Sequence, residues 1–414
     1  MAELYVERGV ERYVEHGALR VLSLYEGFFS GGARVLHSSV VAGLHGQGRQ
    51  RHAALSIHDE VRRDAALQRM VDDRRYRQLT AAGVRVTSLG RSSEVPHDPE
   101  VLTDAEAEVL ARALRGTDVV LSLKEQPLRL LAHPEVLPDR PVVACLHRSD
   151  PEHQGSGLGH LLRAADDGRL AAVVCCAEST RAAYEAAGVP AHLLRVIPNG
   201  VDLTRFRPAR PARRLAVRGA HRLPADGTVV TYAARYDAMK NPRLFVAAAR
   251  ELLGADADAH VVMCGSGMSP TNPDLAADLH DAFGDRPDLL ARVHLLGVRH
   301  DMEQVLAASD VVALTSAFGE AAPLCLIEGA MCGAVPVTTP VGDSARIVDG
   351  IGLVTGFEPA EIAAAWREAA ARRDALTGAL VAARPRFSHV RMLSGYASTI
   401  ERAHRGLGLT LARA

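Results

Sequence analysis

Strand-like apolar runs alternate with helical patterns along the chain, and this alternation is the feature that most constrains the fold. It predicts α/β architecture with parallel sheets, because parallel strands need a long crossover connection, usually a helix. The runs form one series in each half of the sequence: 19–24, 84–89, 119–123, 141–146 and 172–177, then 228–234, 259–264, 293–296, 311–315 and 335–338.

The chain has 414 residues, which is too many for one compact core and favours two domains of about 200 residues. Turn signals at 197–202 and an arginine- and alanine-rich stretch at 208–222 separate the two series. We therefore predict one domain over residues 1–206, a second over 207–385, and a final amphipathic helical segment over 386–414.

Bulk composition excludes several classes of protein. The formal net charge of −1 gives no electrostatic reason to expect a nucleic-acid partner, and no apolar run approaches the length of a membrane span. Four glutamates within residues 1–16 argue against a signal peptide, and six cysteines without a C-x-x-C pair favour reduced thiols. A cytoplasmic protein is the expectation, with a peripheral membrane contact left open and the oligomeric state unknown.

Lysine is rare, since Lys124 and Lys240 are the only lysines among 48 basic residues. A chain that uses arginine nearly everywhere can keep a lysine where a compact ammonium is needed. Both lysines are therefore candidates for a functional site.

Two glutamates, Glu320 and Glu328, flank the start of a predicted short helix. Pro323 favours a helix start and Gly333 a helix end, so Glu320 is expected in the preceding loop and Glu328 within the helix. A helix N-terminus attracts anions such as a diphosphate, and the carboxylates can accept hydrogen bonds from sugar hydroxyls. The pattern favours a nucleotide-sugar site.

This segment, continuing through Gly333-Ala334-Val335-Pro336-Val337 to Val341-Gly342-Asp343, resembles the E-x7-E element of the retaining glycosyltransferases of family 4. The resemblance covers residues 19–405. It implies the GT-B fold: two Rossmann-like domains facing a cleft, with the last helix crossing back to the first domain. It further implies donor binding by the C-terminal domain, acceptor binding by the N-terminal domain, and transfer of a hexosyl group from a nucleotide-diphosphate sugar to a hydroxyl, with no cofactor required.

The resemblance also implies roles for individual residues. Arg235 and Lys240 match an R-x4-K signature, with Ala234 in place of the usual preceding glycine, and would stabilise the leaving diphosphate. Glu320 would hold the sugar, Glu328 the ribose, and His147, at the end of a strand, would contact the donor sugar. The catalytic candidates are thus Glu320, Arg235, Lys240 and His147.

Further donor-binding candidates are loop residues at strand ends and the predicted helix start. Two adjacent glycines after the first strand allow close approach to a phosphate, although a plain tight turn explains them as well. Asn199 and Asp202 match a P-N-G-V-D turn, for which a purely structural role is at least as good an explanation. The remaining donor-binding candidates are Gly31, Gly32, Gly265, Val298, Ala322, Pro323 and Leu324.

Lys124 and Glu125 follow the strand at 119–123 and are the acceptor-binding candidates, because the carboxyl end of such a strand faces the cleft.

No metal site is expected: Asp256 and Asp258 precede a strand rather than follow one. Residues 49–77 are predicted to form a solvated helix pair rather than a membrane-docking face. Gly329, inside the predicted helix, suggests close packing there.

Two other functions stay open. A glycoside hydrolase would use two carboxylates about 5 to 10 Å apart, whereas eight residues of helix separate Glu320 from Glu328 by about 12 Å. A non-catalytic nucleotide-sugar-binding protein would have kept the fold and lost the activity. The sequence does not identify the base, the sugar or the acceptor, for which a small natural product, a cell-surface polysaccharide and a lipid-linked sugar are the candidates.

Overall fold

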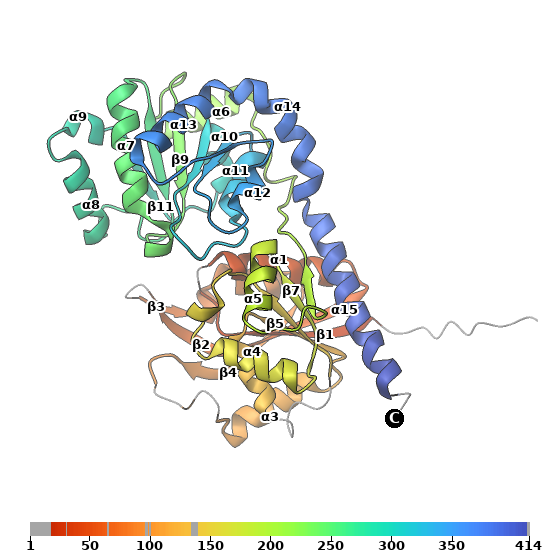
Figure 1. Ribbon diagram of the computed structural model, residues 1–414. Coiled ribbons are helices and arrows are strands. Elements are labelled where there is room, and N and C mark those ends of the chain that lie inside the picture. Colours follow the sequence, from red (N-terminus) through yellow and green to blue (C-terminus); the bar gives the residue numbers. More distant parts are fainter. Residues whose placement is uncertain are drawn as a thin grey trace, which may run out of the picture.

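A computed structural model describes residues 18–29, 31–63, 66–95, 98, 101–133 and 140–411. Two α/β domains are stacked on each other, each built around a predominantly parallel sheet (Figure 1). The acidic residues of 1–16 that argued against a signal peptide lie outside the described residues. Among the helices described, none is long and apolar enough to cross a membrane.

The N-terminal sheet has the order β3-β2-β1-β5-β6-β7-β8, and β4 also pairs with β2. Every pairing is parallel except that between β2 and β3. The strands are β1 (Leu19–Tyr25), β2 (Gln50–Arg63), β3 (Ala66–Arg69), β4 (Arg85–Ser92), β5 (Val119–Leu123), β6 (Val142–Leu146), β7 (Leu170–Cys175) and β8 (Leu194–Val196).

Alternate residues of the central strands face opposite layers of helices. Val119 and Leu121 pack with α1 (Gly32–Gly46) and α15 (His389–Leu411), whereas Val120 packs with α3 (Asp104–Leu114), α4 (Gly157–Asp166) and α5 (Glu178–Ala186). Helix α2 (Arg74–Ala81) lies against α1 and β4. This two-sided burial explains why the strands read as continuous apolar runs.

The C-terminal sheet has the order β11-β10-β9-β12-β13-β14 and is parallel throughout. Its strands are β9 (Val229–Ala233), β10 (His260–Cys264), β11 (Val293–Gly297), β12 (Val311–Leu314), β13 (Val335–Thr338) and β14 (Leu353–Val354). Its helices are α6 (Pro211–Ala220), α7 (Pro242–Ala255), α8 (Pro273–Phe283), α9 (Pro287–Leu290), α10 (Met302–Ala308), α11 (Leu324–Met331), α12 (Ser344–Val348) and α13 (Pro359–Ala371).

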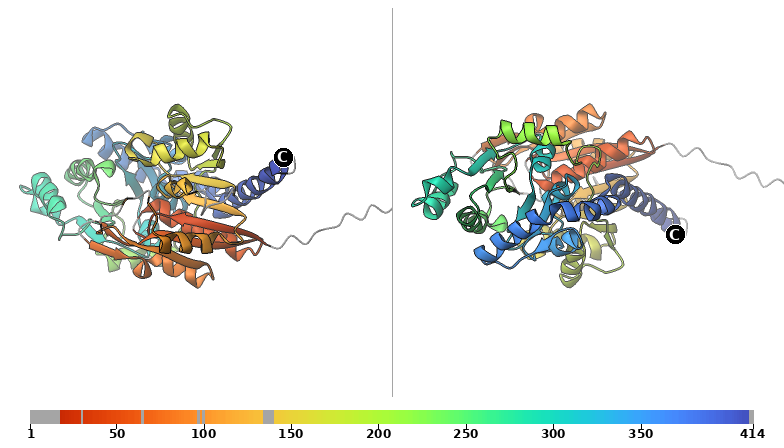
Figure 2. Two further views of the ribbon diagram at one scale, coloured as in Figure 1. Left: turned by 90° about the horizontal axis from the view of Figure 1, so that it is seen from below. Right: turned by 90° about the horizontal axis from the view of Figure 1, so that it is seen from above.

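The last helices return to the first domain. Helix α14 (Arg373–Ala383) lies with the C-terminal domain, and α15 then runs along the N-terminal sheet, where Met392, Tyr396 and Ile400 join its core (Figure 1). A parallel bridge between Val201 and Ser388 marks the crossing. The turned views show α15 projecting beside the N-terminal domain (Figure 2).

Strand expectations from apolar runs are confirmed, but the interpretation of residues 49–77 is wrong. Residues 50–56 of β2 pair with β1 along its whole length, and β3 and α2 follow. Leu55 and Ile57 are buried between arginines at both ends of the segment. The charged ends dominated the composition of the segment and hid the apolar centre of β2. The six cysteines are free thiols, as expected.

Gly329 shows why a glycine stands inside α11. A Cβ at this position would overlap the side chain of Val312 on β12, so α11 lies closer to the sheet than any other residue allows. The packing of this helix sets the position of the loop that precedes it.

Gly329→Ala should destabilise the protein by about 1–3 kcal/mol, because overpacking outweighs the gain of about 1 kcal/mol in helix propensity. Urea unfolding would measure the free energy of unfolding of Gly329→Ala and of a matched control variant, each relative to the wild type. Gly378→Ala, in α14 with no atom within 4 Å of the added Cβ, should leave stability unchanged or raise it. Equal stability of the two variants would contradict the packing argument.

Candidate active site

A cavity of about 210 Å³ lies between the two domains, at the carboxyl ends of β1, β5, β6, β9 and β12. Most of the residues singled out from the sequence line it, although they come from five different segments of the chain. They are Gly31, Gly32, Lys124, His147, Arg235, Lys240, Glu320, Ala322, Pro323 and Leu324. Glu125, Glu328, Gly265 and Val298 are not among its lining residues.

Glu320 and Lys240 form an ion pair inside the cavity, 80 residues apart in sequence. Ser316 donates its hydroxyl to Oε1 of Glu320 at 2.6 Å, and the Glu320 carbonyl accepts from Ser149 of the other domain. Both side chains are largely removed from water, at 16% and 6% exposure for Lys240 and Glu320. The carboxylate is therefore oriented before any ligand arrives.

Arg235 lies beside this pair at the end of β9. Its guanidinium is 3.0 Å from Asp237, which also accepts from the Met239 amide at 3.0 Å and so begins the short 3₁₀ turn η4 (Ala238–Lys240). This turn presents the Lys240 side chain to the cavity. Two cations thus lie close to the start of α11, where no side chain caps the helix.

Gly31 and Gly32 form the start of α1 on the opposite wall. A Cβ at either position would meet only a side-chain tip at 3.9 Å, Arg34 in one case and Leu324 in the other. The packing of the protein itself does not require glycine at either position. Two glycines therefore keep this wall open to a ligand.

His147 follows β6 and has a buried Nε2 atom with no hydrogen-bond partner. Burial, together with the positive charges of Lys124 and Arg34, lowers the pKa of this imidazole to about 3. His147 is therefore neutral throughout the physiological range, and it can donate or accept one hydrogen bond but carries no charge.

Lys124 has a left-handed backbone, with φ of 68°, which costs a non-glycine residue on the order of 1 kcal/mol. The conformation is held by the Ser122 hydroxyl, which donates to the Lys124 carbonyl at 2.9 Å. The Lys124 ammonium donates to Oε1 of Gln154 at 3.1 Å. The strained turn directs the lysine into the cavity.

Glu125 points the other way and is 1% exposed. Its carboxyl accepts from the Tyr184 hydroxyl, and burial raises its pKa. This side chain belongs to the core behind Lys124 and does not line the cavity, so a direct contact with an acceptor would require the side chain to move.

Glu328 lies on the next turn of α11, on the side that faces α10. Removal from water raises its pKa to about 7, with Arg205 opposing the shift and Glu303 adding to it. This carboxyl therefore changes its charge near neutral pH.

Gly265 and Val298 lie at the carboxyl ends of β10 and β11, outside the cavity. Gly265 has φ of 137°, and a Cβ there would overlap the carbonyl of Ala234, just ahead of Arg235. Its amide donates to the Gly297 carbonyl at 2.8 Å. Val298 is 63% exposed, so its backbone and side chain are open to a ligand.

The structure adds lining residues that the sequence patterns did not identify: Arg34, Arg148 and Met239. Arginine is too common in this chain for its mere presence to be a signal. Asn199, interpreted as a turn residue, also lines the cavity, and its amide donates to the Ala322 carbonyl at 2.8 Å. Asp202 accepts from Thr204 within its own turn, as a structural turn predicts.

Asp343 links the domains next to the cavity. Its two carboxylate oxygens accept from the amides of Glu178 and Ser179 at 2.9 and 2.8 Å, which satisfies the start of α5 in the other domain. A carboxylate at a helix N-terminus is favourable both as a hydrogen-bond acceptor and against the helix dipole.

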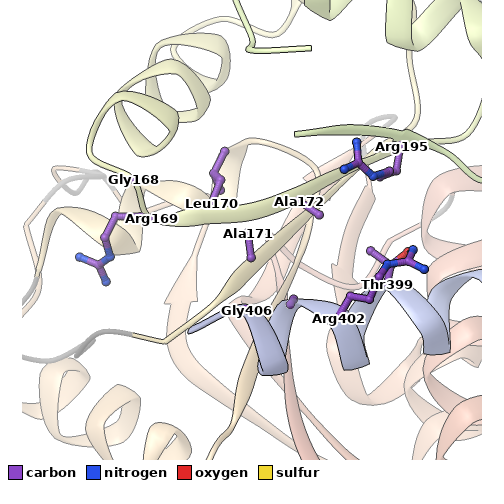
Figure 3. A pocket seen from close by; sticks show the side chains of 10 residues that line it. Gly168, Arg169, Leu170, Ala171, Ala172, Arg195, Thr399, Arg402 and Gly406 are labelled. Atoms are coloured by element: carbon purple, nitrogen blue, oxygen red, sulfur yellow. The ribbon is translucent and has the colours of Figure 1, made fainter. Parts of the chain in front are cut away.

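Larger hollows lie at the opposite end of the N-terminal sheet. One, of about 300 Å³, lies between the start of β7 and α15, with Arg195 and Arg402 at one end and Arg169 apart from them (Figure 3). Another, of about 800 Å³, includes Arg20, Arg49 and Arg51. Neither includes a residue singled out from the sequence, and both lie at strand amino ends, where α/β sheets do not usually bind ligands.

Two family models match the chain, one in each domain. Glycosyltransferase Family 4 matches residues 74–205, and Glycosyl transferases group 1 matches residues 227–372. These matches confirm the predicted resemblance to the family 4 glycosyltransferases.

Curated relatives match parts of the chain. The D-inositol 3-phosphate glycosyltransferase of Geodermatophilus obscurus is 31% identical over 236 residues, which are 55% of this chain and 51% of that protein. The Mycobacterium tuberculosis protein of the same name is 34% identical over 170 residues, 39% of this chain and 33% of that protein. The matched part thus spans about half the length of the first relative and a third of the second.

Solved structures match nearly the whole chain. HepE of Anabaena in complex with UDP and glucose has a TM-score of 0.75 at 21% identity, covering 92% of this chain and 99% of that one. Sucrose-phosphate synthase of Thermosynechococcus elongatus has a TM-score of 0.67 at 16% identity, covering 95% and 100%. These likenesses confirm the predicted GT-B fold.

Asp343→Ala should lower the unfolding free energy by about 1–2 kcal/mol, because two amides of α5 lose their acceptor. Asp349→Ala, at the other end of α12 and exposed, is the matched control and should change it little. Differential scanning calorimetry compares the two variants. A loss of equal size in both would argue against the inter-domain cap.

Proposed function

We propose that this protein is a retaining glycosyltransferase that moves a hexosyl group from a nucleotide-diphosphate sugar to a hydroxyl acceptor. The observation that carries the proposal is the convergence of Arg235, Lys240 and Glu320 on one cavity at the start of α11. A diphosphate fits the two cations and the helix N-terminus, and a sugar fits the oriented carboxylate.

The donor extends from this point along the C-terminal domain. Its diphosphate lies against the start of α11, with Gly31 and Gly32 approaching from the other wall. Its ribose reaches Glu328 one turn further along α11, and its base lies beside the loop of Val298, with Gly265 shaping the backbone between them. The complex of HepE with UDP and glucose makes a nucleotide-sugar donor reasonable for this fold.

The sugar is transferred by substitution on the face from which the diphosphate leaves. The bond between the anomeric carbon and the phosphate oxygen breaks as the acceptor oxygen bonds to the same carbon, and the departing phosphate takes the acceptor proton. Arg235 and Lys240 stabilise the charge that builds on the diphosphate, and Glu320 holds sugar hydroxyls. Neutral His147 contacts the sugar by a hydrogen bond.

Lys240 must release Glu320 when a diphosphate binds, since the two side chains are paired in this structure. Ser316 remains hydrogen-bonded to Glu320, so the carboxylate keeps its orientation when it accepts hydrogen bonds from the sugar hydroxyls in place of Lys240.

The acceptor enters from the N-terminal domain, where Lys124 faces the cavity and Glu125 supports it from the core. Small natural products and precursors of cell-surface glycans are suitable acceptors. We further propose that residues 1–206 form the acceptor-binding domain, that residues 207–385 form the donor-binding domain, and that residues 386–414 pack back on the first domain. We also propose that the reaction requires no metal cofactor and that the protein is cytoplasmic.

The two alternative functions fit the cavity less well. A glycoside hydrolase needs two carboxylates facing one bond, and among the described lining residues Glu320 alone carries one. A non-catalytic binding protein would not need the complete set of Arg235, Lys240 and Glu320 in one cavity.

The test is a screen of nucleoside diphosphates for thermal stabilisation, followed by turnover of the matching nucleotide sugars in excess EDTA. Binding stabilises a protein by RT ln(1 + [L]/Kd), so a true donor nucleotide raises the melting temperature. Products that keep the anomeric configuration of the donor support a retaining transferase. Nucleotide-independent hydrolysis of a disaccharide supports the hydrolase, and nucleotide-sugar binding without turnover supports the binding protein.

Lys240→Ala should lower kcat by about 100-fold or more, because removal of a donor to developing charge typically costs that much. Steady-state kinetics with the matched donor would measure it, and Arg210→Ala, an exposed arginine before α6, provides a control. Near-wild-type turnover of Lys240→Ala would remove the lysine from the mechanism.

Affinity for the nucleotide sugar should fall as pH falls through about 7, because the ionised form of Glu328 is the better acceptor from the ribose hydroxyls and its pKa is about 7. Below this pKa the protonated form of Glu328 predominates, and it must lose its proton before it can accept from the ribose. The apparent affinity for the nucleotide sugar therefore falls by up to tenfold for each unit of pH. The nucleotide sugar is the right probe, since its diphosphate does not titrate in this range.

Calorimetric titration between pH 6 and 8 checks this, with Glu328→Gln expected to bind more weakly at pH 8 and to lose the pH dependence. Glu320→Gln should instead keep the pH dependence and lower turnover. A pH profile that survives in Glu328→Gln would assign the titrating group elsewhere.

A further inference from the structure

A groove follows α15 on the N-terminal domain, away from the cavity. Two hollows form it: one of about 800 Å³ at the start of β1 and β2, and one of about 380 Å³ between the end of α1 and α15. Both hollows include Arg49 and Glu401, so they are continuous. The groove reaches along α15 from Val390, which is 71% exposed, to Arg405, a distance of about 22 Å at 1.5 Å per residue.

The wider hollow is rich in arginine. Its arginine and carboxylate lining residues are Arg20, Arg49, Arg51, Arg405, Asp118 and Glu401. Asp118 is already engaged, because it accepts from the Arg20 amide at 2.8 Å and from the Arg20 guanidinium at 3.3 Å. Neither Arg49 nor Arg51 forms an ion pair with a described residue, although Arg51 is the register partner of Arg20 and like charges repel each other. This end of the groove therefore favours an acidic ligand.

The narrower hollow carries little charge apart from the two residues that it shares. Its other lining residues are Leu44, Gln47, Gln50, Val390, Ser394 and Ala397. A ligand that fills the whole groove would thus place acidic groups at the start of β1 and β2 and apolar groups beside the first turns of α15.

The segment that leads into β1 has this composition. Residues 1–17 lie outside the described residues, and Ala18, which follows them, lines the wider hollow. The sequence of the segment repeats glutamate at every fourth position and valine at the same spacing: Glu3, Glu7, Glu11, Glu15, Val6, Val10 and Val14. Four glutamates against two arginines make the segment acidic.

The covalent link to β1 favours this segment over a separate partner. A ligand on a short tether has an effective concentration in the millimolar range, so contacts that are too weak to hold a free peptide can hold it. Residues 3–15 are also long enough for the groove, because even a helix of this length spans about 20 Å.

An anionic membrane and a second copy of the chain fit the groove less well. A bilayer is flat, whereas these arginines line a hollow, and Glu401 among them would repel lipid phosphates. The same glutamate suits a segment that carries Arg8 and Arg12 beside its acids. The segment of a second copy would make the same contacts but would lack the tether.

We propose that residues 1–17 bind in the groove along α15, with their glutamates at the arginines of the wider hollow and their valines toward Val390. This intramolecular contact joins the start of the chain to α15, and so holds the returning helix on the first domain. The inference does not depend on the proposed function, since no residue of the cavity takes part in it.

Limited trypsin digestion of the full-length protein tests this, because Arg8 and Arg12 are trypsin sites within the segment. Mass spectrometry measures the initial rate of cleavage at each site, divided by the rate for a free peptide with the same sequence as the segment. Cleavage of the wild type should be slower than that of Arg49→Gln/Arg51→Gln by about tenfold or more, the effect of losing a few exposed ion pairs. Salt at 1 M should also speed it, since the Debye length falls to about 3 Å.

Arg210→Gln/Arg367→Gln is the matched control, because it removes two exposed arginines from the C-terminal domain and should keep the protection. A variant of the segment, Glu11→Gln/Glu15→Gln, should lose the protection while the folded domain is unaltered. Its effect should not add fully to that of Arg49→Gln/Arg51→Gln, because both variants remove the same contact.

Two results would overturn the inference directly: equal cleavage rates in the wild type and Arg49→Gln/Arg51→Gln, or full protection in the glutamate variant. Protection that rises with protein concentration, together with a dimer in analytical ultracentrifugation, would assign the groove to the segment of a second copy. Binding of the wild type to phosphatidylglycerol vesicles that is lost in the arginine variant, with no difference in cleavage, would assign it to a membrane.

Discussion

The loop that carries Glu320 is held from both domains, and the site depends on this constraint. Its own domain supports it from below, where Gly342 lies so close to the Glu320 carbonyl that no side chain fits between them. The N-terminal domain holds it from above, through Ser149 at the Glu320 carbonyl and Asn199 at the Ala322 carbonyl. Asp343 adds a third link by capping α5. A cleft between two sheets would otherwise hinge freely. These contacts hold the Glu320 carboxylate, the start of α11 and the cavity wall of the N-terminal domain in fixed positions relative to one another.

Burial gives the titratable side chains around this loop different protonation properties. Glu320, in the loop before α11, is paired with Lys240, whereas Glu328, inside α11, is removed from water and has a pKa of about 7. His147 is held neutral between two positive side chains. Glu125, next to Lys124 in sequence, is a core residue rather than a ligand-facing one. The resulting cavity has positively charged side chains on both of its walls.

Most of the fold and part of the site could be predicted from the pattern of residues. Parallel strands buried on both faces read as apolar runs, and this signal is strong enough to place β5 and β13 at their observed bounds. It failed for β2, whose short buried centre is flanked by arginines. The site residues that could be predicted are those with a local signal: glycines after a strand, a proline before a helix, or a rare lysine. Arg148 and Arg34 could not be found, because arginine is common in this chain and only packing shows which arginines face the cavity.

The sequence by itself determined the alternation of strands and helices, the split into two domains, and the motifs that resemble those of family 4. These properties depend on local composition and spacing, which a linear chain carries explicitly. Only the tertiary structure decided that Lys240 meets Glu320 across 80 residues, that Asp343 caps a helix of the other domain, and that Lys124 faces the cavity while Glu125 faces the core. Such relations are distances between segments that are remote in sequence. They depend on how two sheets are packed against each other and on a single backbone angle at Lys124, and neither is written in the order of the residues.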